Sequence, residues 1–214
     1  TKDSPLERHL FKVSVKSGKM SKLTNGAGYH SITANENNTL FMDNFSSTST
    51  PREIRLIDAN GSIKEILNKS KNPLVDYKLG EMKVGKLKGK SGDDLYYRVF
   101  KPIDFNPNKK YPVVVYLYNG PHLQLITNRW LGGANLWYQY MAQHGYVVFS
   151  IDGRGSADRG FEFESSIFRN CGENEMIDQL TGVNWLKSQM WVDSNRFGVH
   201  GWSSVSYTHL TLPT

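Results

Sequence analysis

The sequence predicts an α/β fold preceded by a smaller antiparallel β segment, and three observations support this. Residues 10–75 contain short β-type runs separated by turn residues. From about residue 95 the chain instead alternates continuous apolar runs with segments of helical spacing. Near its end a strand-like run leads into Gly201-Trp202-Ser203. The order of these patterns indicates two structural parts of different class within one chain.

The front part has the strand lengths and turns of an antiparallel sheet. Asn25-Gly26 and Asn60-Gly61 are hairpin-type turn pairs between its runs. Hairpins repeated in this way are typical of a β-propeller, and about one blade fits into this length. A single blade leaves strand edges unpaired, so a whole propeller needs more blades than these residues provide. The predicted strands are 9–15, 22–24, 29–34, 39–44, 53–57 and 63–67.

The second part contains two strands, 111–118 and 146–151, that are apolar on both faces. Such strands are typical of the buried interior of a mostly parallel sheet. The spacing predicts one helix over 136–144, ended by Gly145 as a C-cap, and another over 172–187. We expect the apolar stripe of the second helix to face the sheet; it comprises Met176, Leu180, Val183, Trp185 and Leu186.

A third strand, 196–200, precedes Gly201-Trp202-Ser203. Strand, helix, strand, helix, strand and Gly-x-Ser is the order of an α/β-hydrolase up to its nucleophile. In that motif the serine sits on a sharp strand-to-helix turn, with a glycine two residues before it and another two residues after it. Gly201 is the first glycine, but position 205 is Val205, a β-branched residue that fits such a turn badly.

Composition and charge exclude several classes of function. The net charge of +6 comes from an excess of Lys and Arg within residues 1–90. The densest run, 78–90, alternates lysine with glycine and is typical of solvated sheet edges and turns, without the interleaved aromatic residues of a nucleic-acid surface. No apolar run reaches 18 residues, and the histidines and the single Cys171 lack metal-ligand spacing. We therefore predict no cofactor, no metal and no nucleic-acid partner.

Five spaced motifs resemble the dipeptidyl peptidase IV branch of the prolyl oligopeptidase family of serine peptidases, in its bacterial form. The resemblance implies that 1–75 is the C-terminal blade region of a β-propeller and 76–204 the first half of an α/β-hydrolase domain. It also implies an exopeptidase that releases N-terminal Xaa-Pro or Xaa-Ala dipeptides, with peptide substrates, a homodimeric parent and a periplasmic or cell-surface location. The motifs are Tyr118–His122, Asp152–Ser156, Asn174–Gln179, Val192–Arg196 and His200–Ser203.

The resemblance also assigns roles to individual residues. Ser203 would be the acyl-forming nucleophile, and its oxyanion would be stabilised by the Tyr118 phenol and the Ser204 backbone N–H. The triad Asp and His have no counterpart in this chain, which predicts that these 214 residues alone are inactive. We take Asp152 and Arg154 as partners in local hydrogen bonds or a salt bridge, and His200 as a buried sheet residue.

The segment 205–214 departs from the family and resembles the translation of a sequencing-library adapter. We therefore expect a truncated sequence whose residues 205–214 are a non-native tail and not part of the fold. Two alternatives remain open for the parent protein. One is another hydrolase of the same family, such as an oligopeptidase, an acylaminoacyl-peptidase or an esterase. The other is a non-catalytic propeller and hydrolase-like binding protein, which a genuine Val205 would favour.

Overall fold

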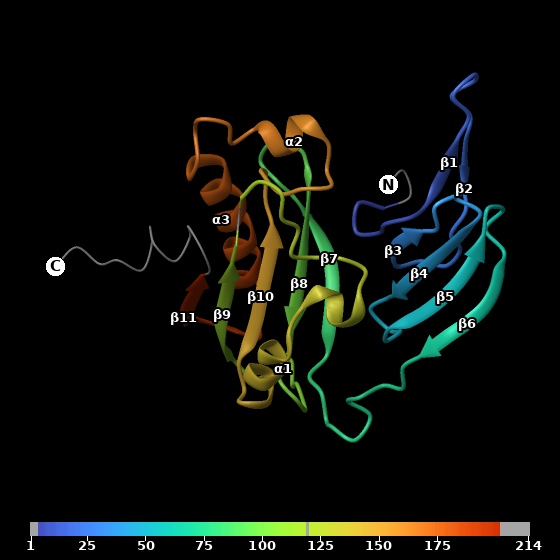
Figure 1. The fold of residues 1–214 in the computed structure, drawn as a ribbon. Helices are drawn as coiled ribbons and strands as arrows, with labels where there is room; N and C mark the ends of the chain where they lie inside the picture. Colours follow the sequence, from blue (N-terminus) through green and yellow to red (C-terminus); the bar gives the residue numbers. More distant parts are fainter. Residues whose placement is uncertain (1–3, 119, 202–214) are drawn as a thin grey trace. The chain divides into compact units, whose positions relative to one another are not determined.

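The structure is a computed structural model that describes residues 4–118 and 120–201. The chain forms two compact units. The first ends at Tyr77 and also includes Thr127–Gly133, while the second comprises Lys78–Ile126 and the residues from Ala134 onward. Figure 1 gives the order of helices and strands along the chain. Among the described residues no helix is long and apolar enough to cross a membrane.

The first unit is built around a four-stranded antiparallel sheet in the order β3-β4-β5-β6, in which each strand pairs with the next along the chain. A separate hairpin, β1 with β2, precedes this sheet. The short 3-10 segment η1, Trp130–Gly133, belongs to the same unit. The bounds are β1 Phe11–Val13, β2 Met20–Lys22, β3 Tyr29–Ala34, β4 Leu40–Ser46, β5 Glu53–Asp58 and β6 Ile63–Lys69.

A buried polar pair lies inside this sheet. His30 Nδ1 on β3 lies 2.8 Å from Asp43 Oδ2 on β4, and both residues are almost fully buried. The ring of His9 packs 4.9 Å from that of His30, and burial lowers the pKa of His9. A buried carboxylate with a hydrogen-bond partner costs far less than an unpaired one. These two histidines therefore have a structural explanation.

The second unit contains a five-stranded mixed sheet in the order β11-β9-β10-β8-β7. The pairs β7–β8 and β8–β10 are antiparallel, whereas β10–β9 and β9–β11 are parallel. The carboxyl ends of β9, β10 and β11 therefore meet at one edge of the sheet. The bounds are β7 Met82–Lys88, β8 Asp94–Phe100, β9 Tyr111–Leu117, β10 Val147–Asp152, β11 Val192–Gly201, α1 Leu136–Gln143, α2 Phe161–Ser165 and α3 Glu173–Lys187.

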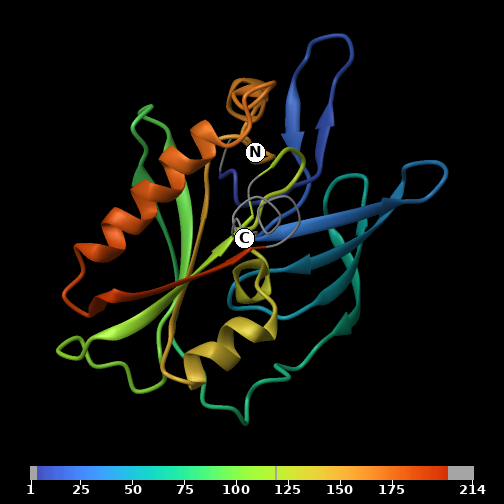
Figure 2. The same cartoon turned by 90° about the vertical axis from the view of Figure 1, so that its left-hand side faces the viewer.

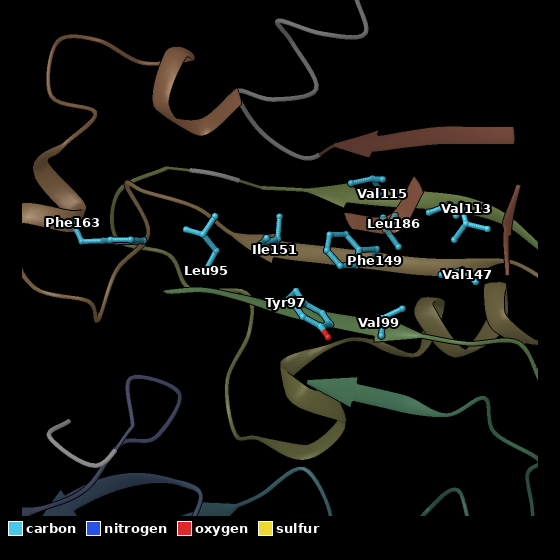
Figure 3. Close-up of a cluster of buried hydrophobic side chains, with 11 residues drawn as sticks. Leu95, Tyr97, Val99, Val113, Val115, Val147, Phe149, Ile151, Phe163 and Leu186 are labelled. Atoms are coloured by element: carbon cyan, nitrogen blue, oxygen red, sulfur yellow. The ribbon is translucent and has the colours of Figure 1, made fainter. Parts of the chain in front are cut away.

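Helices cover both faces of this sheet, which is why β10 is buried along its whole length. Its odd-numbered residues, with Phe149 at the centre, join the core beneath α3 that Figure 3 shows. On the other face Val148 packs with Phe100 and with Tyr138 and Ala142 of α1. Figure 2 shows α1 and α3 on opposite sides of the strands. The prediction of strands that are buried on both faces is confirmed for β10.

Both predicted helices are present, but the inner face of α3 differs from the predicted stripe. Leu186 is buried as expected, whereas Met176 and Leu180 are 38% and 48% exposed. Val183 and Trp185 are half-buried and pack against the core as predicted, whereas Asp178, Gln179 and Gly182 are buried positions outside the predicted stripe. Polar residues occupy this face because each has a partner there: Asp178 binds Arg154, and the Gln179 side chain donates to the Ile151 carbonyl.

Gly182 marks the closest approach of α3 to the sheet. A Cβ at this position would lie 2.8 Å from Phe149 Cε1 and 3.3 Å from Ile151 Cδ1. We expect Gly182→Val to lower the free energy of unfolding by about 3 kcal/mol, since neither neighbour has room to move in a close-packed core. Urea unfolding followed by tryptophan fluorescence measures this. Asn184→Val, at an exposed position of the same helix, is the matched control, and equal losses for both variants would contradict the packing argument.

Two strands of the second unit, β7 and β8, were not predicted from the sequence. The lysine-rich run has the pattern of solvated edges and turns, and most of it is β7, the edge strand of the sheet. Lys83, Lys86 and Lys88 point to solvent, and Asp94 on β8 binds the latter two. Lysines on an edge strand hinder its pairing with other chains. They also give the strand a polar sequence that resembles a loop, which is why it was not predicted.

Candidate functional site

The carboxyl edge of the parallel strands brings one predicted site residue, Tyr118, close to Gly201 of the Gly-x-Ser motif. Tyr118, which is half-buried, directly follows Leu117, the last residue of β9. Leu117 pairs in register with Gly201, the last residue of β11 and the first glycine of the Gly-x-Ser motif. Ser203 and Ser204 lie outside the described residues. The structure therefore places Tyr118 beside the strand end from which the chain continues to the predicted nucleophile.

His200 is exposed, which corrects the prediction that it is a buried sheet residue. Its strand, β11, is the outermost strand of the described sheet, so one long edge of it has no described neighbour. The His200 ring stacks on Trp137 of α1 at 4.9 Å and lies 5.4 Å from the Tyr116 ring. The three rings form an aromatic cluster on the face of the sheet that α1 covers. The exposure of His200 follows from the position of β11 in the strand order, which a single sequence does not reveal.

The loop that follows Tyr118 borders an open, largely apolar pocket of about 420 Å³ beside α2. His122 lies on its rim with 90% of its side chain exposed, and its backbone N–H and its Nδ1 both contact Glu164 Oε1. His122 is thus a surface loop residue close in sequence to Tyr118. The pocket is lined by Pro121, His122, Phe161, Glu164, Ser165, Ile167, Phe168, Arg169 and Cys171.

A buried carboxylate fixes the far end of the same loop. Asp152, the last residue of β10, accepts the Leu125 N–H at 3.0 Å and the Ile126 N–H at 2.8 Å, one on each oxygen. Burial raises the pKa of Asp152 to about 6, although these two bonds and the charge of Arg98 act in the opposite direction. Each Asp152 oxygen accepts a backbone N–H, an arrangement that favours the ionised carboxylate.

Arg98 completes this arrangement from β8. It is 1% exposed, its Nη1 donates to the Leu125 carbonyl at 3.0 Å, and its guanidinium lies 4.7 Å from the centre of the Tyr138 ring. Burial lowers the pKa of Arg98, and Asp152 and Tyr138 counter that effect. None of the sequence motifs includes Arg98. The sequence signal that could have identified it is that Arg98 is the one charged residue in the otherwise apolar second half of β8.

The turn after β10 forms hydrogen bonds and a salt bridge as predicted, but the partners of Asp152 and Arg154 lie 24 to 27 residues away in the sequence and are not local. Arg154 forms a two-pronged salt bridge with Asp178 of α3, with contacts of 2.9 and 3.0 Å, and its backbone N–H donates to the same carboxylate. Gly155 has φ of 94°, and a Cβ there would lie 2.6 Å from Ile167. The predicted structural role of Asp152 and Arg154 is confirmed. The described residues contain no group of three or more His, Cys, Asp or Glu that could hold a metal ion.

Comparisons with known proteins relate the chain to two family models and to several relatives. The model of the prolyl oligopeptidase family matches residues 134–211, and that of the dipeptidyl peptidase IV N-terminal region matches residues 1–52. Dipeptidyl peptidase 8 of Homo sapiens is 36% identical over an alignment of 222 residues, which covers 98% of this chain and 24% of that protein.

Two solved structures are similar to the chain. A Bacteroides ovatus protein assigned as a dipeptidyl aminopeptidase IV has 42% identity and a TM-score of 0.85 over 90% of this chain and 28% of its own. Porphyromonas gingivalis dipeptidyl peptidase 4 has 29% identity and a TM-score of 0.89 over 98% of this chain and 30% of its own. The chain spans about a quarter of the length of the curated relatives it matches.

Proposed function

Because the chain belongs to the dipeptidyl peptidase IV-like prolyl oligopeptidase family, we propose that its parent protein is a serine exopeptidase that releases N-terminal Xaa-Pro or Xaa-Ala dipeptides. The observation that carries this proposal is the register of β9 against β11. It brings Tyr118 to the strand end that leads to Ser203. A nucleophile and an oxyanion donor on adjacent strand ends are two of the parts that acyl transfer by a serine hydrolase requires.

In the proposed reaction the Ser203 hydroxyl attacks the carbonyl carbon of the substrate's second residue. A histidine of the parent protein takes the serine proton and later gives it to the leaving amine. The negative charge that develops on the carbonyl oxygen is stabilised by the Ser204 backbone N–H and the Tyr118 phenol. Water then hydrolyses the acyl-enzyme, which releases the dipeptide and regenerates the serine.

The domain assignment is part of the same proposal. Residues 1–75 form the last blade region of a propeller, since their four-stranded antiparallel sheet is the unit of that architecture. Residues 76–204 form the first half of an α/β-hydrolase domain, and the triad Asp and His come from parts of the parent beyond this chain. The 214 residues alone are accordingly inactive.

We also propose that 205–214 is a non-native tail, since Val205 stands where the motif requires glycine. Sequencing the source locus tests this. A glycine codon at 205 is expected, and an uninterrupted reading through Val205 to Thr214 and a stop codon would refute the proposal.

Cleavage assays on the full-length parent test the activity. We expect release of p-nitroaniline from glycyl-prolyl-p-nitroanilide, and no release from the same compound with an acetylated amine. A dipeptidyl peptidase must recognise the free amine, whereas an oligopeptidase accepts the blocked compound and releases p-nitroaniline from it. Release from the blocked compound alone would move the parent to oligopeptidase activity, and release of acetyl-glycine without p-nitroaniline would move it to acylaminoacyl-peptidase activity. Cleavage of neither, by a protein whose triad is intact, would support a non-catalytic role.

A further inference from the structure

In the loop after Tyr118, residues 123–126 are held by hydrogen bonds to the rest of the second unit. Tyr118 continues from β9, so one side of it is held by the sheet. On the other side the Leu123 carbonyl accepts the Ala157 N–H at 3.0 Å, and three further bonds join Leu125 and Ile126 to Asp152 and Arg98. Ile126 itself is fully buried. The position of the loop therefore depends on two charged side chains inside the unit.

These two side chains lie on one face of the sheet. Arg98 pairs with Ser150 in the β8–β10 register, and Asp152 lies two residues beyond Ser150 and so on the same face. Asp152 and Arg98 are 2% and 1% exposed. Burying two charges is costly unless each is paired and hydrogen-bonded. Here both oxygens of Asp152 and a guanidinium nitrogen of Arg98 bind loop backbone, so the buried charges serve to fix that backbone.

We infer that Asp152 and Arg98 are positioning residues for the oxyanion donor Tyr118. They fix Leu125 and Ile126 at the carboxyl end of β10 and thereby limit how far Tyr118, at the start of the same loop, moves from the developing oxyanion. This inference rests on the proposed function. Oxyanion stabilisation requires donors placed to within about 0.5 Å, and an error of about 1 Å costs about 100-fold in rate.

Steady-state kinetics of the full-length parent on glycyl-prolyl-p-nitroanilide test the inference. We expect Asp152→Asn to lower kcat by about 100-fold and Arg98→Met by about 10-fold, with KM changed less than about 2-fold, because the interaction is made in the transition state. Asp43→Asn, which alters an equally buried aspartate of the first unit, is the control and keeps the wild-type kcat. An unchanged kcat in folded Asp152→Asn would overturn the inference.

A double-mutant cycle separates positioning from a general structural effect. If Asp152 acts through Tyr118, then Asp152→Asn in a Tyr118→Phe background lowers kcat by less than about 2-fold further. A full additional 100-fold loss in that background would overturn the inference, since Asp152 would then act independently of the phenol. Should Asp152→Asn fail to fold, Arg98→Met carries the same cycle. A wild-type parent that cleaves no substrate would instead refute the proposed function, a result distinct from either outcome of the cycle.

Discussion

Replacing Ser203 with alanine in the full-length parent is expected to lower kcat for glycyl-prolyl-p-nitroanilide by about 10⁶-fold. The serine oxygen forms the acyl bond, and no other group at the edge can replace it. The residual rate comes from direct attack of water on the substrate carbonyl, whose oxyanion the remaining donors still stabilise. KM is expected to change little, because alanine leaves the rest of the substrate site intact. Burst kinetics of p-nitroaniline release, present in the wild type when acylation is faster than deacylation and absent in the variant, give a second measurement.

Ser188→Ala is the matched control for this loss. Ser188 follows the last residue of α3, and its hydroxyl donates to the Trp185 carbonyl, so it tests a serine deletion away from the carboxyl edge. It should retain wild-type kcat. If Ser203→Ala retained activity, the nucleophile would lie elsewhere and the Gly-x-Ser motif would have only a structural role.

The elements that sequence predicted well are those whose pattern has one physical reading. The predicted strands 111–118 and 146–151 are present as β9 and β10, and β10 is buried along its whole length as predicted. In β9 only Val113 and Val115 are buried, and its other residues are half-buried. Gly145 has φ of 84° just beyond α1, as a C-cap glycine should. These features are encoded locally, so a single sequence is sufficient to find them.

The parts that sequence predicted poorly depend on partners distant in the chain. Met176 and Leu180 fit an amphipathic stripe, yet α3 turns Asp178 toward the sheet because Arg154, 24 residues earlier, binds it there. A strand position alone suggests that His200 is buried, but its exposure depends on strand order. The candidate site is divided in the same way. The motif identifies Tyr118, whereas the support from Arg98 becomes visible only when β8 is paired with β10.

The second large effect is expected at Tyr118. Tyr118→Phe removes one hydroxyl and retains the ring, so we expect kcat to fall by about 100- to 1000-fold while KM changes less than about 2-fold. A donor that acts only on the developing oxyanion contributes nothing to ground-state binding, which is why the two constants should separate. Tyr140→Phe, at an exposed position of α1, is the control and should leave both constants unchanged.

A transition-state analogue makes the Tyr118 test more specific. A boronic acid that mimics glycyl-proline forms a tetrahedral adduct with Ser203, whose oxygen occupies the oxyanion position. If the phenol donates to that oxygen, Tyr118→Phe weakens the analogue by about the same factor as it lowers kcat, because catalysis and analogue binding then share one interaction. If Tyr118→Phe lowered kcat/KM by this factor but left the affinity for the analogue unchanged, the tyrosine would instead orient the substrate. The register of Leu117 with Gly201 would in that case bring a specificity residue to the nucleophile.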